Sequence, residues 1–151
     1  FETALSFDVV VAERSAKMGL PEILFNLFPG MGAYSLLTRR IDPIRAEQMI
    51  MSGRIYSAEE LHDMGLVDVL AEDGEGEAAL RDYIERNRRK FNAHRAIYQA
   101  RRISKPVSRQ ELTDIVDVWV DAVFELGEHD LRRMTHLVSA QDRRLAAAIA
   151  A

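Results

Sequence analysis

The sequence predicts an α/β fold in which short strands come first and helices follow. Two β-rich stretches, Phe7–Ala12 and Val67–Leu70, have the composition of buried strands. From Glu77 to Ser104, apolar side chains recur at the three- and four-residue spacing of an amphipathic helix. We therefore expect two parts: the end of a mixed α/β core in residues 1–72, and a helical subdomain in residues 73–151.

Composition limits the class of protein. The 151 residues suit about one domain, and the 48% of hydrophobic residues are enough for a core. The net charge of −4 argues against a general nucleic-acid-binding protein. No apolar run is long enough for a membrane span. The absence of cysteine excludes disulfides and thiolate chemistry and fits a reducing, cytoplasmic location.

Short elements are expected at the start of the chain. Glu2–Ser6 has the pattern of a short helix, and Lys17–Gly19 that of an extended segment. Gly30 and Gly32 follow a proline and permit a tight turn with close backbone approach. A helix is then expected over Ala33–Arg40.

The next two helices have clear capping signals. Asp42 is a good N-cap, and Pro43 suits the first helical position after it. Gly53 suits the end of that helix. Ser57 and Glu60, three residues apart, predict a capping box at the start of the following short helix.

The second half of the chain is expected to be helical. The pattern over Glu77–Ser104 allows a break near Asn92. Ser108 and Glu111 predict a second capping box, and a last helix is expected to start near His129. The apolar stripes of these last two helices comprise Leu112, Ile115, Val116, Trp119, Val123 and Phe124, and then Leu131, Met134, Leu137, Val138 and Leu145. Because both stripes are too extensive for an exposed hairpin, they predict two packed helices that help to build an oligomer.

The strongest candidate for chemistry is Glu22. It follows Pro21, which sets the backbone for a helix start or turn, in a segment that is otherwise almost entirely apolar. Poor solvation beside residues such as Leu24 and Phe25 raises a carboxyl pKa, which suits proton transfer near neutral pH. The alternative is structural, because the helix dipole also favours a glutamate in a first turn.

A helix with Glu2, a strand-like segment, a Pro-Glu pair and a Pro-Gly-Met-Gly turn follow one another at the start of the chain. This order resembles the crotonase, or enoyl-CoA hydratase/isomerase, superfamily. In its hydratases two glutamates face one water or hydroxyl group, and Glu2 and Glu22 match their positions. The resemblance implies that residues 1–72 are the last part of a core of repeated ββα units arranged as a spiral. It also implies that residues 73–151 form the helical subdomain that closes the pocket and builds a homotrimer.

The segments 19–22 (Gly-Leu-Pro-Glu) and 28–35 (Phe-Pro-Gly-Met-Gly-Ala-Tyr-Ser) are more specific. They are similar to the diffusible signal factor synthases, bacterial crotonase-fold enzymes that make cis-2-unsaturated fatty acid signals. The resemblance implies that the two glutamates dehydrate a 3-hydroxyacyl thioester on acyl carrier protein and that the thioester is then hydrolysed. Proton transfer and carbonyl polarisation need no metal or redox cofactor. Which glutamate acts as acid and which as base stays open.

The same resemblance assigns the catalytic and substrate-binding residues. Glu2 and Glu22 are the catalytic pair. The residues expected to bind substrate are Leu20, Gly30, Met31, Gly32, Trp119 and Leu137. Met31 and the stripe with Trp119 would line an acyl tunnel. The alternative for Trp119 is core packing, since pockets and cores are lined by the same residue types.

Two other functions stay open. The first is an ordinary enoyl-CoA hydratase or isomerase that acts on CoA thioesters. The second is a non-catalytic crotonase-fold module that binds a regulatory partner such as a sensor protein. A binding module would not need both Glu2 and Glu22, so their joint presence argues against it.

Residues 81–105 are locally basic, because arginine and lysine outnumber Asp82 and Glu85 there. Such runs usually form a solvated helix face. The functional alternative is a docking surface for an acidic acyl carrier protein or for CoA phosphates. The four histidines of the chain lack metal-ligand spacing such as HExxH.

The resemblance also suggests that the chain begins inside the fold. In the superfamily, a glycine-rich segment ahead of the position of Phe1 supplies two backbone donors to the thioester oxygen. The loss of one such donor costs about a hundredfold or more in rate. We therefore expect residues 1–151 alone to be inactive and to need the N-terminal part of the same enzyme.

Overall fold

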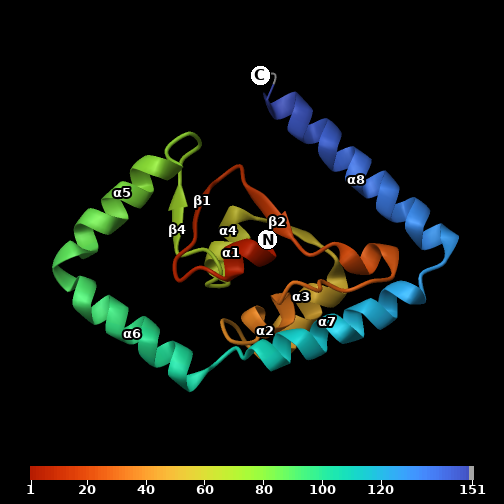
Figure 1. The fold of residues 1–151 in the computed structure, drawn as a ribbon. Coiled ribbons are helices and arrows are strands. Elements are labelled where there is room, and N and C mark those ends of the chain that lie inside the picture. The colour runs from red at the N-terminus through yellow and green to blue at the C-terminus, as the bar shows by residue number, and fades with distance from the viewer. Residues whose placement is uncertain (150–151) are drawn as a thin grey trace.

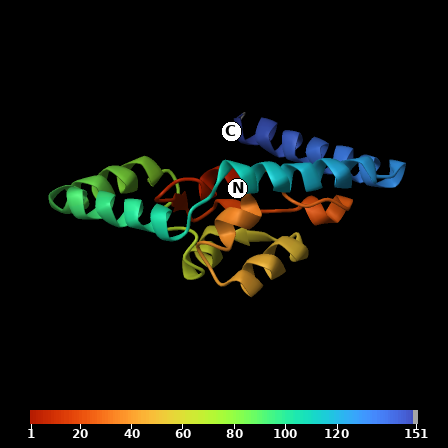
Figure 2. The ribbon, with the colours of Figure 1, turned by 60° about the horizontal axis from the view of Figure 1, so that its bottom comes forward.

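The computed structural model describes the backbone of residues 1–149 and the side chains of residues 1–143 and 146. Short helices and strands form a central unit, and longer helices extend from it on two sides (Figure 1). The helices α5 and α6 project on one side, and α7 and α8 extend on the other (Figure 2). This arrangement confirms the predicted α/β class with a helical C-terminal region.

The elements of the central unit are α1 (Glu2–Leu5), β1 (Val11–Glu13), β2 (Lys17–Gly19), the 3₁₀ helix η1 (Glu22–Phe25), α2 (Ala33–Leu37), α3 (Pro43–Ser52), β3 (Ile55–Ser57), α4 (Ala58–Asp63) and β4 (Val69–Ala71). The helical part contains α5 (Gly76–Asn87), the 3₁₀ helix η2 (Arg88–Lys90), α6 (Phe91–Ser104), α7 (Arg109–Phe124) and α8 (Glu128–Ile149). Strand β1 pairs in parallel with β4, with Val11 opposite Val69. Strand β2 pairs antiparallel with β3, with Lys17 opposite Ser57.

One hydrophobic core holds the central unit together. Leu5 of α1, Leu37 of α2 and Leu61 of α4 are fully buried in it. Leu20, which joins β2 to η1, belongs to the same core. The segments that carry the two candidate acids are therefore anchored to one packed interior.

The capping predictions for α3 and α4 are confirmed. The carboxylate of Asp42 accepts hydrogen bonds from the backbone N–H groups two and three residues further on. Gly53 ends α3 with a φ of 58°, and a Cβ there would lie 2.7 Å from the side chain of Ile23 in η1. Ser57 and Glu60 form the reciprocal capping box of α4.

Both strands predicted from β-rich composition are shorter than expected. The stretch 7–12 is reduced to β1, and the stretch 67–70 is replaced by β4. The reason is a side-chain interaction at the start of the pair. The N–H of Val10 donates to the carboxylate of Asp68 at 2.7 Å, and the N–H of Asp68 donates to the carbonyl of Val10 at 2.8 Å. The side-chain bond takes up the N–H of Val10, which a longer ladder would need.

The long helix expected over 77–104 is broken at η2, just before Asn92, which agrees with the break that the sequence allows near that residue. The side-chain amide of Asn87 donates to the carbonyl of Tyr83 at 2.8 Å. This bond competes with the backbone for that carbonyl and favours a break immediately afterwards. Across the break, the hydroxyls of Tyr83 and Tyr98 lie 3.4 Å apart and hold α5 and α6 together.

The helix expected over 33–40 ends earlier, with α2. The hydroxyl of Thr38 donates to the carbonyl of Tyr34 at 2.9 Å, and the Arg39 guanidinium donates to the carbonyl of Ser35 at 2.8 Å. Side-chain donors thus occupy the last carbonyls of the helix and end it. One result is that the side chain of Arg39 is held close to the start of α7.

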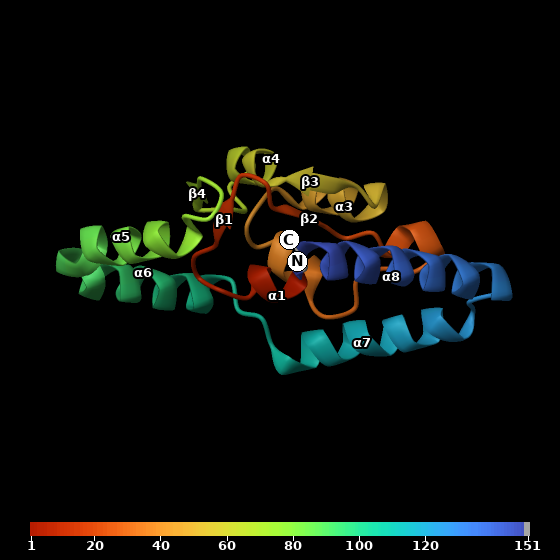
Figure 3. The same cartoon turned by 90° about the horizontal axis from the view of Figure 1, so that it is seen from above.

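Helices α7 and α8 diverge from their connecting turn instead of packing along each other (Figures 1 and 3). Each packs on the central unit: α7 against the turn at Gly30 and Gly32, and α8 against η1. Every side chain of α5, α6 and α7 is described, and none of them is buried. Phe124 is 82% exposed. Of the predicted stripe of α8, Leu145 lies outside the described side chains.

Within the described residues, no helix combines the length and apolar character that a bilayer crossing requires.

We expect Leu61→Ala to destabilise the protein by about 2–5 kcal/mol, because it opens a cavity in a fully buried site. The matched control is Leu80→Ala on α5, where the side chain is 41% exposed. Urea unfolding followed by circular dichroism measures both changes. Similar losses for the two variants would contradict the location of the core.

Candidate active site

Glu22 is the first residue of η1, directly after Pro21. Its Oε2 atom is buried and has no hydrogen-bond partner among the described residues. Burial raises the pKa of Glu22, and the negative charge of Glu2 raises it further. A buried acceptor without a partner costs about 1–3 kcal/mol. The site therefore favours the protonated carboxyl or a bound group that donates a hydrogen bond.

Glu2 is the second candidate acid, and its surroundings differ. Its side chain lies in α1 and is 7% exposed. Its Oε1 atom accepts hydrogen bonds from the N–H of Met31 at 2.9 Å and from the N–H of Ala33 at 3.0 Å. Gly32 stands between these donors with a φ of 101°, a conformation that suits glycine. One oxygen of Glu2 is thus clamped by a turn.

The two acids act on each other electrostatically, since the charge of Glu2 contributes to the raised pKa of Glu22. That both reach the same substrate atoms stays a prediction.

Helix α7 lies directly on the turn that holds Glu2. A Cβ added to Gly30 would lie 2.5 Å from Cδ1 of Trp119, and one added to Gly32 would lie 3.3 Å from Cδ2 of Leu112. Glycine at position 30 is needed for this close approach. The structure therefore places three of the predicted substrate-binding residues, Gly30, Gly32 and Trp119, in one cluster.

The other predicted binding residues lie in different surroundings. Leu20 is 1% exposed and packs in the core, whereas Met31 is 77% exposed beside the turn. Leu137 of α8 and Leu24 of η1 line a cleft of about 340 Å³. Leu137 is thus close to the short helix that begins with Glu22. The roles of these three residues in binding stay predictions.

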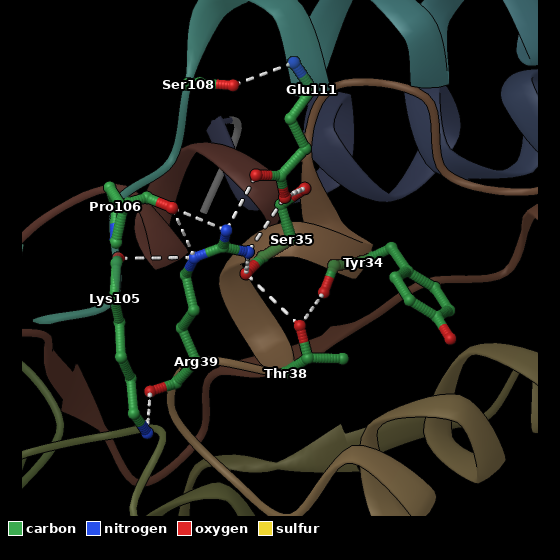
Figure 4. Close-up of polar contacts among 8 residues, drawn as sticks. All are labelled: Tyr34, Ser35, Thr38, Arg39, Lys105, Pro106, Ser108 and Glu111. Atoms are coloured by element: carbon green, nitrogen blue, oxygen red, sulfur yellow. Dashed lines mark hydrogen bonds and ion pairs between the residues drawn. The ribbon is translucent and has the colours of Figure 1, made fainter.

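A polar network near the site was not anticipated from the sequence (Figure 4). The predicted capping box of α7 is only half formed: the Ser108 hydroxyl accepts from the N–H of Glu111 at 3.0 Å, but no return bond is made. The Glu111 carboxylate instead accepts from Arg39 NH1 and NH2 at 2.8 and 2.7 Å, and from the Ser35 hydroxyl at 2.6 Å. The Ser35 and Arg39 bonds lower the pKa of Glu111.

No local sequence signal could have revealed this network. Arg39 and Glu111 are 72 positions apart, and the spacing of Glu111 from Ser108 matches a capping box. The two long-range partners displaced the local one because a forked guanidinium binds a carboxylate more strongly than a single backbone N–H does.

The basic run over residues 81–105 is partly neutralised by acids. Arg101 and Arg102 pair with the two carboxylate oxygens of Asp8 at 2.7 and 2.6 Å. Arg86 pairs with Asp82 at 2.6 Å. In the part of the chain that the structure describes, no cluster of three or more potential metal-binding side chains occurs. Docking of an acidic partner or of CoA phosphates on this run stays a prediction.

Comparison with known proteins identifies the family. Residues 1–116 match the family model described as enoyl-CoA hydratase/isomerase. The chain belongs to this family. The recognition of the crotonase superfamily from Glu2, Glu22 and the glycine turn is thereby confirmed.

The curated relatives are hydratases. The chain is 38% identical over 110 residues to the 2,3-dehydroadipyl-CoA hydratase of Escherichia coli (strain K12), which covers 72% of this chain and 43% of that protein. It is 39% identical over 85 residues to the mitochondrial methylglutaconyl-CoA hydratase of Rattus norvegicus, covering 56% of this chain and 27% of the relative. The chain thus spans less than half the length of these relatives.

Solved structures confirm the crotonase fold. A candidate enoyl-CoA hydratase from Streptomyces avermitilis matches with a TM-score of 0.73 over 92% of this chain and 50% of that one, at 23% identity. The enoyl-CoA hydratase of Mycobacterium tuberculosis H37Rv matches with a TM-score of 0.60 over 91% of this chain and 55% of that one, at 26% identity. The closer resemblance to diffusible signal factor synthases stays a prediction.

We expect Glu22→Gln to raise the unfolding temperature at neutral pH and to lose this advantage in acid. Because the pKa of Glu22 is raised on folding, the stability that its proton contributes is complete below the pKa of the unfolded chain, near pH 4. It is lost as the pH rises through the folded pKa, where the buried charge becomes a cost. Glutamine never bears that charge.

Melting curves from pH 4 to pH 8 measure the effect. The matched control is Glu47→Gln, which removes one charge from an exposed position of α3. A difference between Glu22→Gln and the unchanged protein that stays constant with pH would contradict the burial of the Glu22 carboxylate.

Proposed function

We propose that the chain carries the acid–base pair of an enzyme that adds water to, or removes it from, the α,β carbon–carbon bond of an acyl-CoA thioester. The observation that carries this proposal is the Oε2 atom of Glu22, which is buried without a partner among the described residues and whose pKa the charge of Glu2 helps to raise, together with the Glu2 carboxylate that two backbone amides clamp. The two relatives described above are a 2,3-dehydroadipyl-CoA hydratase and a methylglutaconyl-CoA hydratase, which supports a CoA thioester as the substrate class.

The chemistry follows from the two carboxyl groups. In the dehydration direction, one carboxylate takes the α-proton of a 3-hydroxyacyl thioester and the other carboxyl gives its proton to the leaving hydroxyl, which departs as water. In hydration each group reverses its step. The raised pKa of Glu22 suits a group that must both hold and release a proton near neutral pH. The turn that clamps Glu2 keeps the second carboxylate in place.

A second candidate function is synthesis of a cis-2-enoic acid signal. In that reaction a 3-hydroxyacyl group on acyl carrier protein is dehydrated, and water then cleaves the thioester to release the free acid. Two features of the segment 28–35 support this second candidate: Gly30 lies against Trp119, and the next residue, Met31, has an exposed apolar side chain. That apolar surface next to the acid pair would suit a long acyl chain.

We also propose that the helical part builds a homotrimer. Helices α5, α6 and α7 bury no side chain within this chain, although they carry large apolar residues such as Ile97, Ile103 and Phe124. Apolar faces of this extent are characteristic of protein interfaces. A regulatory sensor protein is the alternative occupant of the same faces.

The function is tested with the complete natural polypeptide and its Glu22→Gln variant. Glutamine keeps the shape of the side chain but cannot exchange a proton, so we expect a loss of turnover of about a hundredfold or more. Hydration of enoyl-CoA is followed by absorbance, with Glu47→Gln as the control. Near-normal turnover of Glu22→Gln would refute the catalytic role.

The same assay separates the two substrates. Hydration or dehydration of CoA thioesters without release of free acid supports the first proposal. Preference for 3-hydroxyacyl-acyl carrier protein, with a free cis-2-enoic acid in the mass spectrum, would replace it with the second.

The trimer is tested by sedimentation. We expect the mass of three chains, and we expect Phe124→Glu to lower it, because a charge on the exposed face of α7 opposes burial there. Ile44→Glu, at a 68% exposed position on α3, is the matched control. A monomer at all concentrations, or equal effects of both variants, would overturn the proposal.

A further inference from the structure

We propose that Arg39 and Glu111 are positioning residues for the acid pair. Their ion pair determines where α7, which carries Trp119, lies on the turn that clamps Glu2. The consequence for catalysis rests on the proposed function, whereas the consequence for the turn does not.

The ion pair is highly connected. The two terminal nitrogens of Arg39 bind the two carboxylate oxygens of Glu111, as Figure 4 shows. The same guanidinium donates to the carbonyl of Ser35 at 2.8 Å, and to the carbonyl of Pro106 at 2.6 Å from NH2 and at 3.1 Å from Nε. It thereby joins α2, the segment before α7 and the first turn of α7. Lysine has the charge but not the planar fork that these partners require.

Both ends of the ion pair lead to the clamp on Glu2. On the α2 side, Ser35 is 1% exposed and lies two residues after Ala33, whose N–H binds Glu2. Its hydroxyl donates to Glu111 at 2.6 Å. The turn and the ion pair are thus parts of one continuous chain of contacts.

On the α7 side, Glu111 lies in the first turn of the helix. The next residue, Leu112, reaches Gly32, and about two helical turns further on Trp119 reaches Gly30. The space between Trp119 and Gly30 is too small for a Cβ, so a small displacement of α7 changes this contact directly. We expect such a displacement to disturb the turn and the direction of its N–H groups toward Glu2.

The alternative is that the ion pair only stabilises the contact between two elements. In that case its loss would lower the unfolding temperature without changing the turn. A positioning role predicts a change at Trp119 and at the turn amides, even in variants that remain folded at the assay temperature.

The test uses the complete natural polypeptide with Arg39→Lys, Glu111→Gln and the milder Ser35→Ala. Trp119 is the only tryptophan of residues 1–151, so its fluorescence reports the position of α7 once any tryptophan outside these residues has been replaced by phenylalanine. We expect a red shift in Arg39→Lys and Glu111→Gln. Hydrogen exchange is expected to accelerate at the amides of Met31 and Ala33 in the same variants. The matched control is Arg81→Lys, since Arg81 pairs with Glu77 on the exposed surface of α5.

For turnover we expect kcat to fall about ten- to a hundredfold with little change in KM, because a misplaced catalytic group weakens the transition state more than substrate binding. Unchanged fluorescence and unchanged exchange at Met31 and Ala33 would overturn the proposal, whatever the unfolding temperature. If Arg39→Lys does not fold, the fluorescence of Trp119 and the exchange at Met31 and Ala33 in Ser35→Ala test the proposal instead. If the unchanged enzyme acts on no thioester, the proposed function fails, and fluorescence and exchange still decide the positioning role.

Discussion

The candidate site depends on the clamp that the turn at Met31–Ala33 places on the Glu2 carboxylate. An ionised carboxylate that is nearly buried is costly unless hydrogen bonds replace its water. Two backbone N–H groups at 2.9 and 3.0 Å supply these bonds, and they can converge on one oxygen because Gly32 adopts a positive φ. The position of α1, the shape of the turn and the start of α2 therefore follow from one requirement.

Glu22 is the counterpart of this arrangement. Its side chain is only partly buried, but its Oε2 atom is buried and the described residues offer that atom no donor; both burial and the charge of Glu2 raise the pKa of Glu22. Two carboxyl groups with different surroundings are what acid–base chemistry near neutral pH requires, since one must keep a proton that the other releases. The differences come from backbone geometry and burial, not from additional charged side chains.

The features predicted correctly from the sequence are those whose causes lie within a few residues. The caps of Asp42 and Ser57 depend on the first turn of their own helices, and both formed as expected. The errors arose where a distant partner took over a local group. The carboxylate of Asp68, 58 positions further along the chain, binds the N–H of Val10, and the strand therefore begins only after Val10. In the same way, Arg39 binds the carboxylate of Glu111, 72 positions away, and this carboxylate therefore does not make the return bond of the predicted capping box.

Glu22 is a candidate from its apolar segment alone, whereas Glu2, and the pairing of the two acids, were found only through the family resemblance. The local pattern around Glu22 is equally compatible with a dipole-stabilised helix start, and Glu2 stands in an unremarkable short helix. The features that support both residues come from tertiary structure. Glu2 accepts hydrogen bonds from two amides of the turn around position 32, and Glu22 has a buried oxygen atom. The amides that hold Glu2 are not visible in the residues next to it along the chain, whereas the apolar neighbours of Glu22 already predict the poor solvation that raises its pKa.

The helical part is weakly packed, yet it touches both halves of the site. Helix α7 backs the turn that clamps Glu2 through Trp119, and α8 packs against η1, which begins with Glu22. The central unit has its own buried core, whereas α5, α6 and α7 bury no side chain within this chain. Contacts that cover the exposed faces of α7 and α8 would therefore stabilise the surroundings of both acids at once. In this arrangement, assembly through these faces would also stabilise the geometry of the acid pair.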